Sequence, residues 1–351
     1  MLRREEPIAI FMQGATQNSI GKMGFGVLRY SPNPIACVID SDQAGRDSEE
    51  VTGIPRKAPI VSTIREAKSK GAKVLLLGIA PPGGLIPADW YPVIEEAIAE
   101  GMSVVNGLHD LLSPRFNNLP DGQYIWDIRV EPSDIGVATG AASKLQSKRV
   151  LMIGTDMAIG KMTAGLELYR ALRERGVSTE FVATGQIGIT LTGRGVPLDA
   201  VRVDYAAGAM EKAVVEASEG GTEIVIIEGQ GALAHPGSTA NLPLLRGTMP
   251  THLVLCHRAG QTHLQKLSNV AIPHLGDYIR LYEDLASVGG TFPRPTTIGI
   301  ALNTSHLDDH DAICAMAQVE RETGLMTCDP VRFGPDRLAN NLVGLTPKAL
   351  R

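Results

Sequence analysis

Residues 149–176 read RVLMIGTDMAIGKMTAGLELYRALRERG, and this stretch decides the fold of the second half of the chain. An apolar run of strand length leads into a glycine-bounded loop that ends at Gly160 and Lys161, and an amphipathic helical pattern follows. Small residues let backbone N–H groups turn inward, while the helix N-terminus and the lysine add positive charge. This order of strand, glycine-bounded loop and helix predicts a phosphate-binding loop. The alternative is a strand-to-helix turn with a surface lysine.

The spacing within this loop differs from the common one. Five residues separate Gly154 from Gly160, where the common consensus has four. Met162 occupies the position whose hydroxyl normally holds Mg²⁺, and Thr163 follows about 100° further round the helix. Phosphate binding is therefore favoured over metal-dependent hydrolysis, and no residue is assigned to a metal. The predicted binding residues are Gly154, Thr155, Asp156, Gly160, Lys161, Met162 and Thr163.

A second segment, EIVIIEGQGALAHPG at 223–237, supports the first. Glu228 ends a β-branched apolar run, and two glycines and His235 follow it. In folds with a phosphate loop, a carboxylate after a neighbouring strand lies close to that loop and can act on a nucleophile or hold Mg²⁺. We predict that Glu228 or His235 is the catalytic base. A carboxylate that only caps a turn or makes an ion pair is the alternative for Glu228.

The N-terminal half contains a weaker copy of the same pattern. In FMQGATQNSIGKMGFGVLRY, at 11–30, a strand and Gly14 precede Ile20-Gly21-Lys22-Met23, which repeats the later IGKM. This recurrence suggests two related α/β units. We predict that Gly14, Gly21 and Lys22 bind an anion, either a phosphate or a substrate carboxylate. A longer loop without a ligand is the alternative.

Apolar runs alternate with helical patterns almost throughout, as in parallel sheets covered by helices. We predict a doubly layered α/β protein with an N-terminal Rossmann-like sheet in residues 1–140 and a C-terminal P-loop NTPase-like domain in 141–351. The alternation of strand and helix patterns weakens between 110 and 148, where proline, asparagine and charged residues are mixed. The predicted strands are 8–14, 35–40, 59–62, 73–80 and 103–108 in the first domain, and 149–154, 178–185, 223–229, 252–257 and 296–303 in the second.

Composition excludes several classes of protein. The formal net charge is −5, so the chain lacks the basic field of a nucleic-acid-binding protein. No apolar run is long enough to span a membrane, and the N-terminus is unlike a secretory signal. The four cysteines are scattered without a metal-like spacing. We therefore expect a cytoplasmic homo-oligomer, a dimer or larger, that acts on a small molecule and has no nucleic-acid or membrane partner.

Two resemblances add to this interpretation. GTDMAIGKMT, IIEGQGA and GIALN resemble the P-loop fold of dethiobiotin synthetase, whose loop has the same five-residue interval. Over nearly its full length the chain resembles a two-domain family formerly of unknown function, some of whose members are described as D-glutamate N-acetyltransferases. The segments that carry this second resemblance are GKMGFGVLRY, GIAPPGG, NGLHDLL, GTDMAIGKMT, ATGQIGI and EGQGALAHP.

The second resemblance implies an acyltransferase that moves an acetyl group from acetyl-CoA to the amine of an acidic amino acid, D-glutamate. Coenzyme A carries a 3′-phosphate and a diphosphate that a phosphate loop can hold without a metal. For the substrate carboxylates we predict Lys22, Arg29 or Arg194. The first resemblance implies instead an ATP-dependent ligase or kinase that uses Mg²⁺. A nucleotide-binding regulator without turnover is the third hypothesis.

Overall fold

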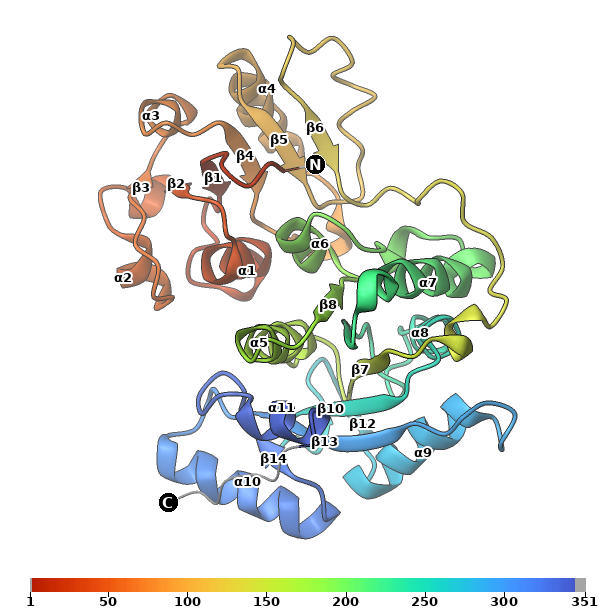
Figure 1. The fold of residues 1–351 in the computed structure, drawn as a ribbon. Coiled ribbons are helices and arrows are strands. Elements are labelled where there is room, and N and C mark those ends of the chain that lie inside the picture. Colours follow the sequence, from red (N-terminus) through yellow and green to blue (C-terminus); the bar gives the residue numbers. More distant parts are fainter. Residues whose placement is uncertain (1, 345–351) are drawn as a thin grey trace. The chain divides into compact units, whose positions relative to one another are not determined.

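The computed structural model describes residues 2–344, which form two compact units. Of these residues, one unit comprises 2–131 and 186–200, and the other comprises 132–185 and 201–344. Each contains a six-stranded sheet in which all strand pairs are parallel (Figure 1). The predicted fold class is therefore confirmed, with a Rossmann-like first unit and a P-loop-like second unit.

The first sheet has the strand order β3-β2-β1-β4-β5-β6, in which the order reverses between β1 and β4. Its strands are β1 (Ile8–Phe11), β2 (Ile35–Ile39), β3 (Ile60–Val61), β4 (Val74–Leu77), β5 (Ser103–Asn106) and β6 (Ile125–Asp127). Its helices are α1 (Lys22–Tyr30), α2 (Ser48–Thr52), α3 (Ile64–Ser69), α4 (Tyr91–Ala99) and α6 (Gln186–Thr192), with short 3₁₀ turns η1 (Ser19–Gly21), η2 (Ser41–Gln43), η3 (Pro82–Gly84), η4 (Ala88–Trp90) and η6 (Leu198–Ala200).

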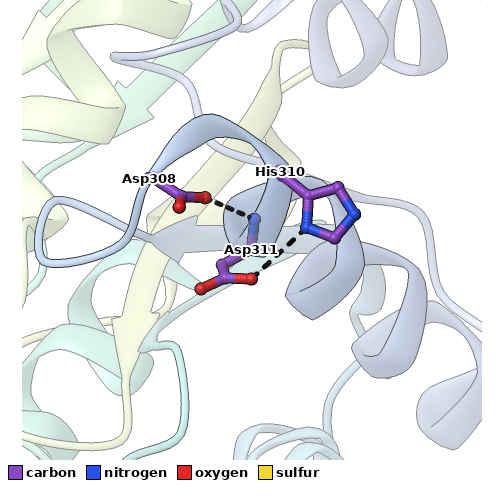
Figure 2. Close-up of side chains that lie close together, drawn as sticks. All are labelled: Asp308, His310 and Asp311. Carbon is purple, nitrogen blue, oxygen red and sulfur yellow. Dashed lines mark hydrogen bonds and ion pairs between the residues drawn. The ribbon is translucent and has the colours of Figure 1, made fainter.

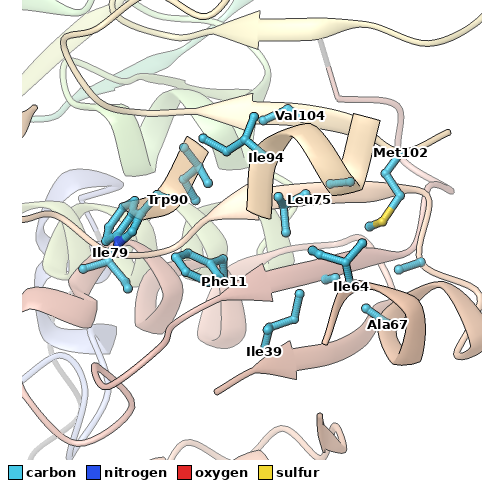
Figure 3. Close-up of a cluster of buried hydrophobic side chains, with 14 of the residues drawn as sticks. Phe11, Ile39, Ile64, Ala67, Leu75, Ile79, Trp90, Ile94, Met102 and Val104 are labelled. Atoms are coloured by element: carbon cyan, nitrogen blue, oxygen red, sulfur yellow. The ribbon is translucent and has the colours of Figure 1, made fainter. Parts of the chain in front are cut away.

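Continuous apolar strands bury both faces of the first sheet, as a parallel sheet requires. On one face the strands pack against α3 and α4, and Phe11 meets Trp90 edge to face with 5.2 Å between ring centroids. Figure 3 shows this cluster, which includes Phe11, Ile39, Ile64, Ala67, Leu75, Ile79, Trp90, Ile94, Met102 and Val104.

The second sheet has the order β14-β13-β10-β7-β9-β8. Its strands are β7 (Lys148–Gly154), β8 (Thr179–Val182), β9 (Ile224–Ile227), β10 (His252–Arg258), β13 (Thr296–Asn303) and β14 (Thr327–Cys328), and β11 (His263–Leu264) and β12 (Leu267–Ala271) form a separate hairpin. The helices are α5 (Lys161–Glu174), α7 (Val203–Ala217), α8 (Asn241–Thr248), α9 (Leu275–Ser287), α10 (Asp309–Thr323) and α11 (Asp336–Leu342), with 3₁₀ turns η5 (Ala141–Lys144) and η7 (Glu219–Gly221).

The segment 186–200 belongs to the first unit although both its neighbours in sequence belong to the second. Its helix α6 packs beside α1 (Figure 1), and Gly26 makes this approach possible because a Cβ there would lie 2.4 Å from Ile187 Cγ2. Farther along, Asp199 forms an ion pair with Arg129 at 3.1 Å. The sequence predicts a single boundary after residue 140. The structure instead divides the chain after residue 131 and returns to the first unit for these fifteen residues.

Candidate functional site

The predicted phosphate loop connects β7 to α5 in the second unit. Gly160 has φ 109°, a conformation that favours glycine, and Ala158 is also left-handed with φ 53°. The amide of Ala164 is bonded to the carbonyl of Gly160 at 2.8 Å, which closes the first turn of α5. The three preceding amides, at 161–163, therefore lie at the start of the helix, where no intrahelical acceptor exists. This arrangement presents donors and a positive helix end in one place.

Lys161 is the charged group of this loop, and it is buried. Its Nζ donates to the carbonyl of Asp156 at 2.8 Å. Burial lowers the pKa of Lys161, whereas the charges of Cys256, Asp156 and Glu228 oppose that shift. The ammonium thus lies against the loop backbone and within the electrostatic range of Glu228. A buried ammonium with one backbone acceptor is well suited to bind an anion, because the anion would replace the hydrogen bonds to water that the ammonium loses on burial.

Side chains from the next strand hold the start of the loop. The hydroxyl of Thr155 is 2.8 Å from Nδ1 of His257, the sixth residue of β10, and both residues are buried. One oxygen of the Asp156 carboxylate accepts from Gln261 Nε2 at 2.7 Å and from the amide of Gln265 at 2.8 Å. The side chains of Thr155 and Asp156 therefore form hydrogen bonds within the protein, and these bonds stabilise the conformation of the loop.

Burial lowers the pKa of His257 to about 4, so the folded protein keeps this ring neutral. The unfolded chain binds the proton near pH 6.5. We expect the free energy of unfolding to be highest above pH 6.5 and to fall as the pH drops from 6.5 towards 4, by up to about 3 kcal/mol. Urea unfolding at a series of pH values measures this. His257→Gln should flatten that part of the profile, and an equal pH dependence in the variant would contradict the assignment.

The far end of the loop and its entry are held by two further side chains. Asn303, the last residue of β13, donates to the carbonyl of Ile159 at 3.2 Å. The buried hydroxyl of Tyr278, on α9, donates to the carbonyl of Gly154 at 3.3 Å and accepts from the amide of Ala234 at 3.1 Å. One phenol thus joins the phosphate loop to the segment that precedes His235. These contacts prearrange the loop.

Glu228 follows β9 directly and is 5% exposed. Its Oε2 accepts from the amides of Thr184 at 2.9 Å and Gly185 at 3.2 Å. The next residue, Gly229, packs so closely on β7 that a Cβ would lie 1.6 Å from the carbonyl oxygen of Met152 and 3.2 Å from Lys161 Cδ. The absence of a side chain at Gly229 is what lets the carboxylate-bearing loop approach the phosphate loop.

His235 is half-buried in a turn of the same loop. Its Nδ1 accepts from the amide of Gly237 at 3.1 Å, which leaves the proton of the neutral ring on Nε2. In this arrangement Nε2 of the neutral ring is a hydrogen-bond donor. Glu228 is therefore the better candidate for a base.

The N-terminal copy of the loop uses its amides inside the protein. The amide of Gly14 is bonded to Asp40 Oδ1 at 3.2 Å, and that of Gly21 to the carbonyl of Asn18 at 3.2 Å. Met12 fills the space beside this loop, since its Sδ would lie 2.4 Å from a Cβ on Gly24. The predicted amide cradle at Gly14 and Gly21 is thus absent among the described residues, because local carboxyl and carbonyl groups take the donors.

The remaining predicted residues lie on the surfaces of the two units. Lys22 and Arg29 are exposed on α1, and Arg194 is exposed after α6; all three belong to the first unit. Met162 and Thr163 are half-buried in the first turn of α5 in the second unit.

His257, Gln261 and Tyr278 were not among the predicted site residues. His257 ends its predicted strand, at the carboxyl edge where ligands bind in parallel sheets, and this signal was available. Gln261 lies in a turn and Tyr278 in a helix, and neither carries a pattern that indicates contact with a loop more than a hundred residues away.

One group of possible metal ligands lies close together among residues 2–344. It consists of Asp308, His310 and Asp311 at the start of α10, all exposed (Figure 2). Asp308 accepts from the amide of Asp311 at 2.8 Å, which is an ordinary helix N-cap. The cluster is therefore explained as a cap, and we assign no metal to it.

Comparisons with known proteins follow the division into two units. Residues 41–131 match the family described as "Domain of unknown function (DUF1611_N) Rossmann-like domain" and residues 136–339 match "Domain of unknown function (DUF1611_C) P-loop domain". A crystal structure of a DUF1611 family protein from Anabaena variabilis is 50% identical and has a TM-score of 0.93. The match covers 97% of this chain and 100% of that one.

Two similar proteins carry the name D-glutamate N-acetyltransferase. The one from a Pseudoalteromonas species is 38% identical over 80% of this chain and 84% of its own length. The one from Tritonibacter scottomollicae is 33% identical over 97% of this chain and 99% of its own length. Among the described residues, no helix combines the length and apolar character needed to cross a membrane.

Proposed function

The chain belongs to the DUF1611 family and is an N-acetyltransferase, and from this premise we propose that it transfers the acetyl group of acetyl-CoA to the amine of D-glutamate. The observation that carries the proposal is the name shared by the two relatives, which match this chain over 80% and 97% of its length. The geometry of the second unit supports it, because the unit combines an anion-binding loop with a buried carboxylate.

The phosphate loop is the proposed site for the coenzyme phosphates. The amides at the start of α5 and the Lys161 ammonium supply donors and positive charge for an oxyanion. Met162 stands where a Mg²⁺-binding loop has a hydroxyl. A loop of this composition can hold the phosphates of coenzyme A as an anchor and needs no phosphoryl transfer.

The proposed reaction is an aminolysis of the thioester. The substrate ammonium loses a proton, the amine nitrogen attacks the thioester carbon, and the C–S bond breaks as the amide C–N bond remains. The nitrogen of the tetrahedral intermediate gives up its second proton as the C–S bond breaks, the leaving sulfur takes up one proton, and the coenzyme leaves as a thiol. We assign the first proton transfer to Glu228, whose buried carboxylate lies within the electrostatic range of Lys161.

Recognition of an acidic acceptor requires cations for its carboxylates. Lys22, Arg29 and Arg194 remain the candidates, on the grounds of charge and of their exposed positions in the first unit. Replacing each in turn by glutamine should raise the KM for the amino acid without changing the affinity for acetyl-CoA, if that residue binds a carboxylate.

Purified protein should release one free thiol per acetylated amine when it is given acetyl-CoA and D-glutamate. Thiol release and the mass of the product measure the reaction. We expect L-glutamate to react poorly, and Glu228→Gln to lower kcat by about 100-fold or more while leaving acetyl-CoA binding intact, because general base catalysis contributes about 10²–10⁴-fold.

Two outcomes would overturn the proposal. One is the absence of acetyl transfer to any acidic amino acid of either configuration. The other is release of ADP from ATP in the presence of Mg²⁺ and candidate substrates, which would favour a ligase or kinase instead.

A further inference from the structure

We propose that Arg258, at the end of β10, is a second cation of the phosphate site and binds the diphosphate of the ligand beside the group held by Lys161. The identity of the ligand as coenzyme A rests on the proposed function. The placement of Arg258 rests on strand pairing, burial and hydrogen bonding within the second unit alone.

Strand register places Arg258 beside the phosphate loop. Strand β10 pairs with β7 in parallel, and Cys256 is the partner of Gly154, the residue at which the loop begins. Arg258 comes two residues later and is the last residue of β10. It therefore lies at the carboxyl edge of the sheet, on the strand adjacent to the one that leads into the loop.

The same register places Arg258 on the face of the sheet that carries Lys161. A Cβ built on Gly154 would lie 3.1 Å from Lys161 Nζ, so this face of β7 points to the ammonium. Cys256 shares the face with its partner Gly154; burial raises the pKa of Cys256, and the charge of Lys161 opposes that shift. Side chains two residues apart on a strand lie on one face. Arg258 thus follows Cys256 on the Lys161 side.

The neighbouring strand on the other side leads to the same result. Arg258 is the register partner of Asn303 on β13, and β10 lies between β13 and β7. Asn303 reaches across to donate to the carbonyl of Ile159, in the middle of the phosphate loop. A side chain on the intervening strand, at the same level and on the same face, lies next to the loop.

Arg258 has no partner in the part of the chain that the structure describes. Its Nε is buried without a hydrogen bond, and its side chain makes no ion pair with residues 2–344. A buried N–H group without an acceptor destabilises a protein, and such groups call for a reason. An anionic ligand that accepts from the guanidinium supplies one.

Arg149, at the opposite end of the same sheet, shows how this protein treats an arginine with a structural role. Its guanidinium is buried and donates to the carbonyls of Leu145, Ser147, Thr248 and Met249 at 2.8–3.2 Å. Arg149 differs from Arg258 in that it does not lie at the proposed ligand site. This contrast indicates that the N–H donors of Arg258 bind a ligand.

A second atom without a partner lies in the turn that follows Arg258. The amide of Gln261 closes this turn on the carbonyl of Arg258, and the buried Oε1 of Gln261 has no donor among the described residues. The Nε2 of the same side chain donates to Asp156 in the phosphate loop. The turn therefore contacts the phosphate loop, and its two ends carry one donor, Arg258 Nε, and one acceptor, Gln261 Oε1, without hydrogen-bond partners among the described residues.

The spacing favours a diphosphate over a single phosphate. Lys161 begins α5, and its Nζ lies against Gly154 at the end of β7, whereas Arg258 ends the adjacent strand. Because adjacent strands lie about 4.8 Å apart, cations at these two places suit two linked phosphate groups. A guanidinium also binds a phosphate through two parallel hydrogen bonds. The inferred ligand class is an organic diphosphate with one phosphate on the loop amides and Lys161 and the other on Arg258.

Calorimetric titration of Arg258→Gln with acetyl-CoA, dephospho-CoA and inorganic pyrophosphate tests this inference without turnover. Because a charged hydrogen-bonding group is lost, we expect the Kd for each ligand to rise about 10-fold or more. Arg258→Lys should recover part of the loss. Arg321→Gln, an exposed arginine on α10, is the matched control and should leave every Kd unchanged.

The outcomes separate this inference from the proposed function. If pyrophosphate or ATP binding depends on Arg258 while acetyl-CoA does not bind, the diphosphate site stands and the proposed acetyl donor fails. Unchanged affinities in Arg258→Gln, or no binding of any of these ligands to the wild-type protein, would overturn the inference. An effect seen with acetyl-CoA but lost with dephospho-CoA would place Arg258 on the 3′-phosphate and overturn the assignment to the diphosphate.

Discussion

Lys161→Ala is expected to weaken acetyl-CoA binding by about 100-fold, the upper part of the range for a hydrogen bond to a charged group. The ammonium of Lys161 is buried against the carbonyl of Asp156, where no bulk water screens its charge. Alanine removes the full charge but keeps the backbone amides and the good helix propensity of the first turn of α5. Calorimetric titration with acetyl-CoA measures the change in Kd.

A matched control separates charge at the site from overall charge. Lys144 is exposed in η5, so Lys144→Ala removes the same charge at a distance from the loop in sequence. We expect the Kd of Lys144→Ala for acetyl-CoA to equal that of the wild-type protein. Circular dichroism and thermal unfolding establish that both variants fold. If folded Lys161→Ala binds acetyl-CoA within threefold of the wild-type protein, the phosphate loop is not the coenzyme site.

Gly229→Ala is expected to destabilise the second unit by more than about 3 kcal/mol, beyond the usual range for an overpacked core. The new Cβ would lie 1.6 Å from the carbonyl oxygen of Met152 and 2.8 Å from its carbon, so the backbone of β7 or of the loop after β9 must shift. Such a shift moves Glu228 relative to Lys161. Urea unfolding measures the stability, and acetyl transfer by any folded fraction measures the loss of geometry.

Gly136→Ala is the control for this substitution. A Cβ at Gly136 meets no atom within 4 Å, and its φ lies outside the left-handed region. The same change of residue should therefore alter the free energy of unfolding by less than about 0.5 kcal/mol, as at ordinary surface positions. Equal stabilities of the two variants would contradict the close packing of β9 and β7.

Strands with long apolar runs were predicted well. The eight-residue strand β13 has its predicted bounds, and β10 extends one residue beyond them. The two-residue strand β3 lies within the strand predicted at 59–62, but two other short strands were missed. Strand β6 has three residues within a stretch rich in proline and asparagine, and β14 has two. Elements this short carry too few residues for a periodic pattern, and pairing with a longer neighbour decides their conformation.

The roles of the predicted site residues stay predictions. Gly160, Lys161 and Glu228 stand in recognisable local contexts, after strands and beside glycines, and the structure places all three in the second unit. Gly14 and Gly21 stand in a similar local context, but Asp40 and Asn18 take their amide donors. Whether a glycine-rich turn is open to a ligand depends on residues that are distant in sequence or folded back on it.

By itself, the sequence indicated most of the strands, the two parallel sheets and the loop before α5. These follow from hydrophobic periodicity and glycine placement, which act over a few neighbouring residues. Only the tertiary structure decided that residues 186–200 join the first unit and that His257 and Tyr278 contact the phosphate loop. It also decided that the buried Nε of Arg258, at the end of β10, has no hydrogen-bond partner among residues 2–344. Those contacts join segments far apart in the chain, and packing of the whole sheet, rather than any local pattern, brings them together.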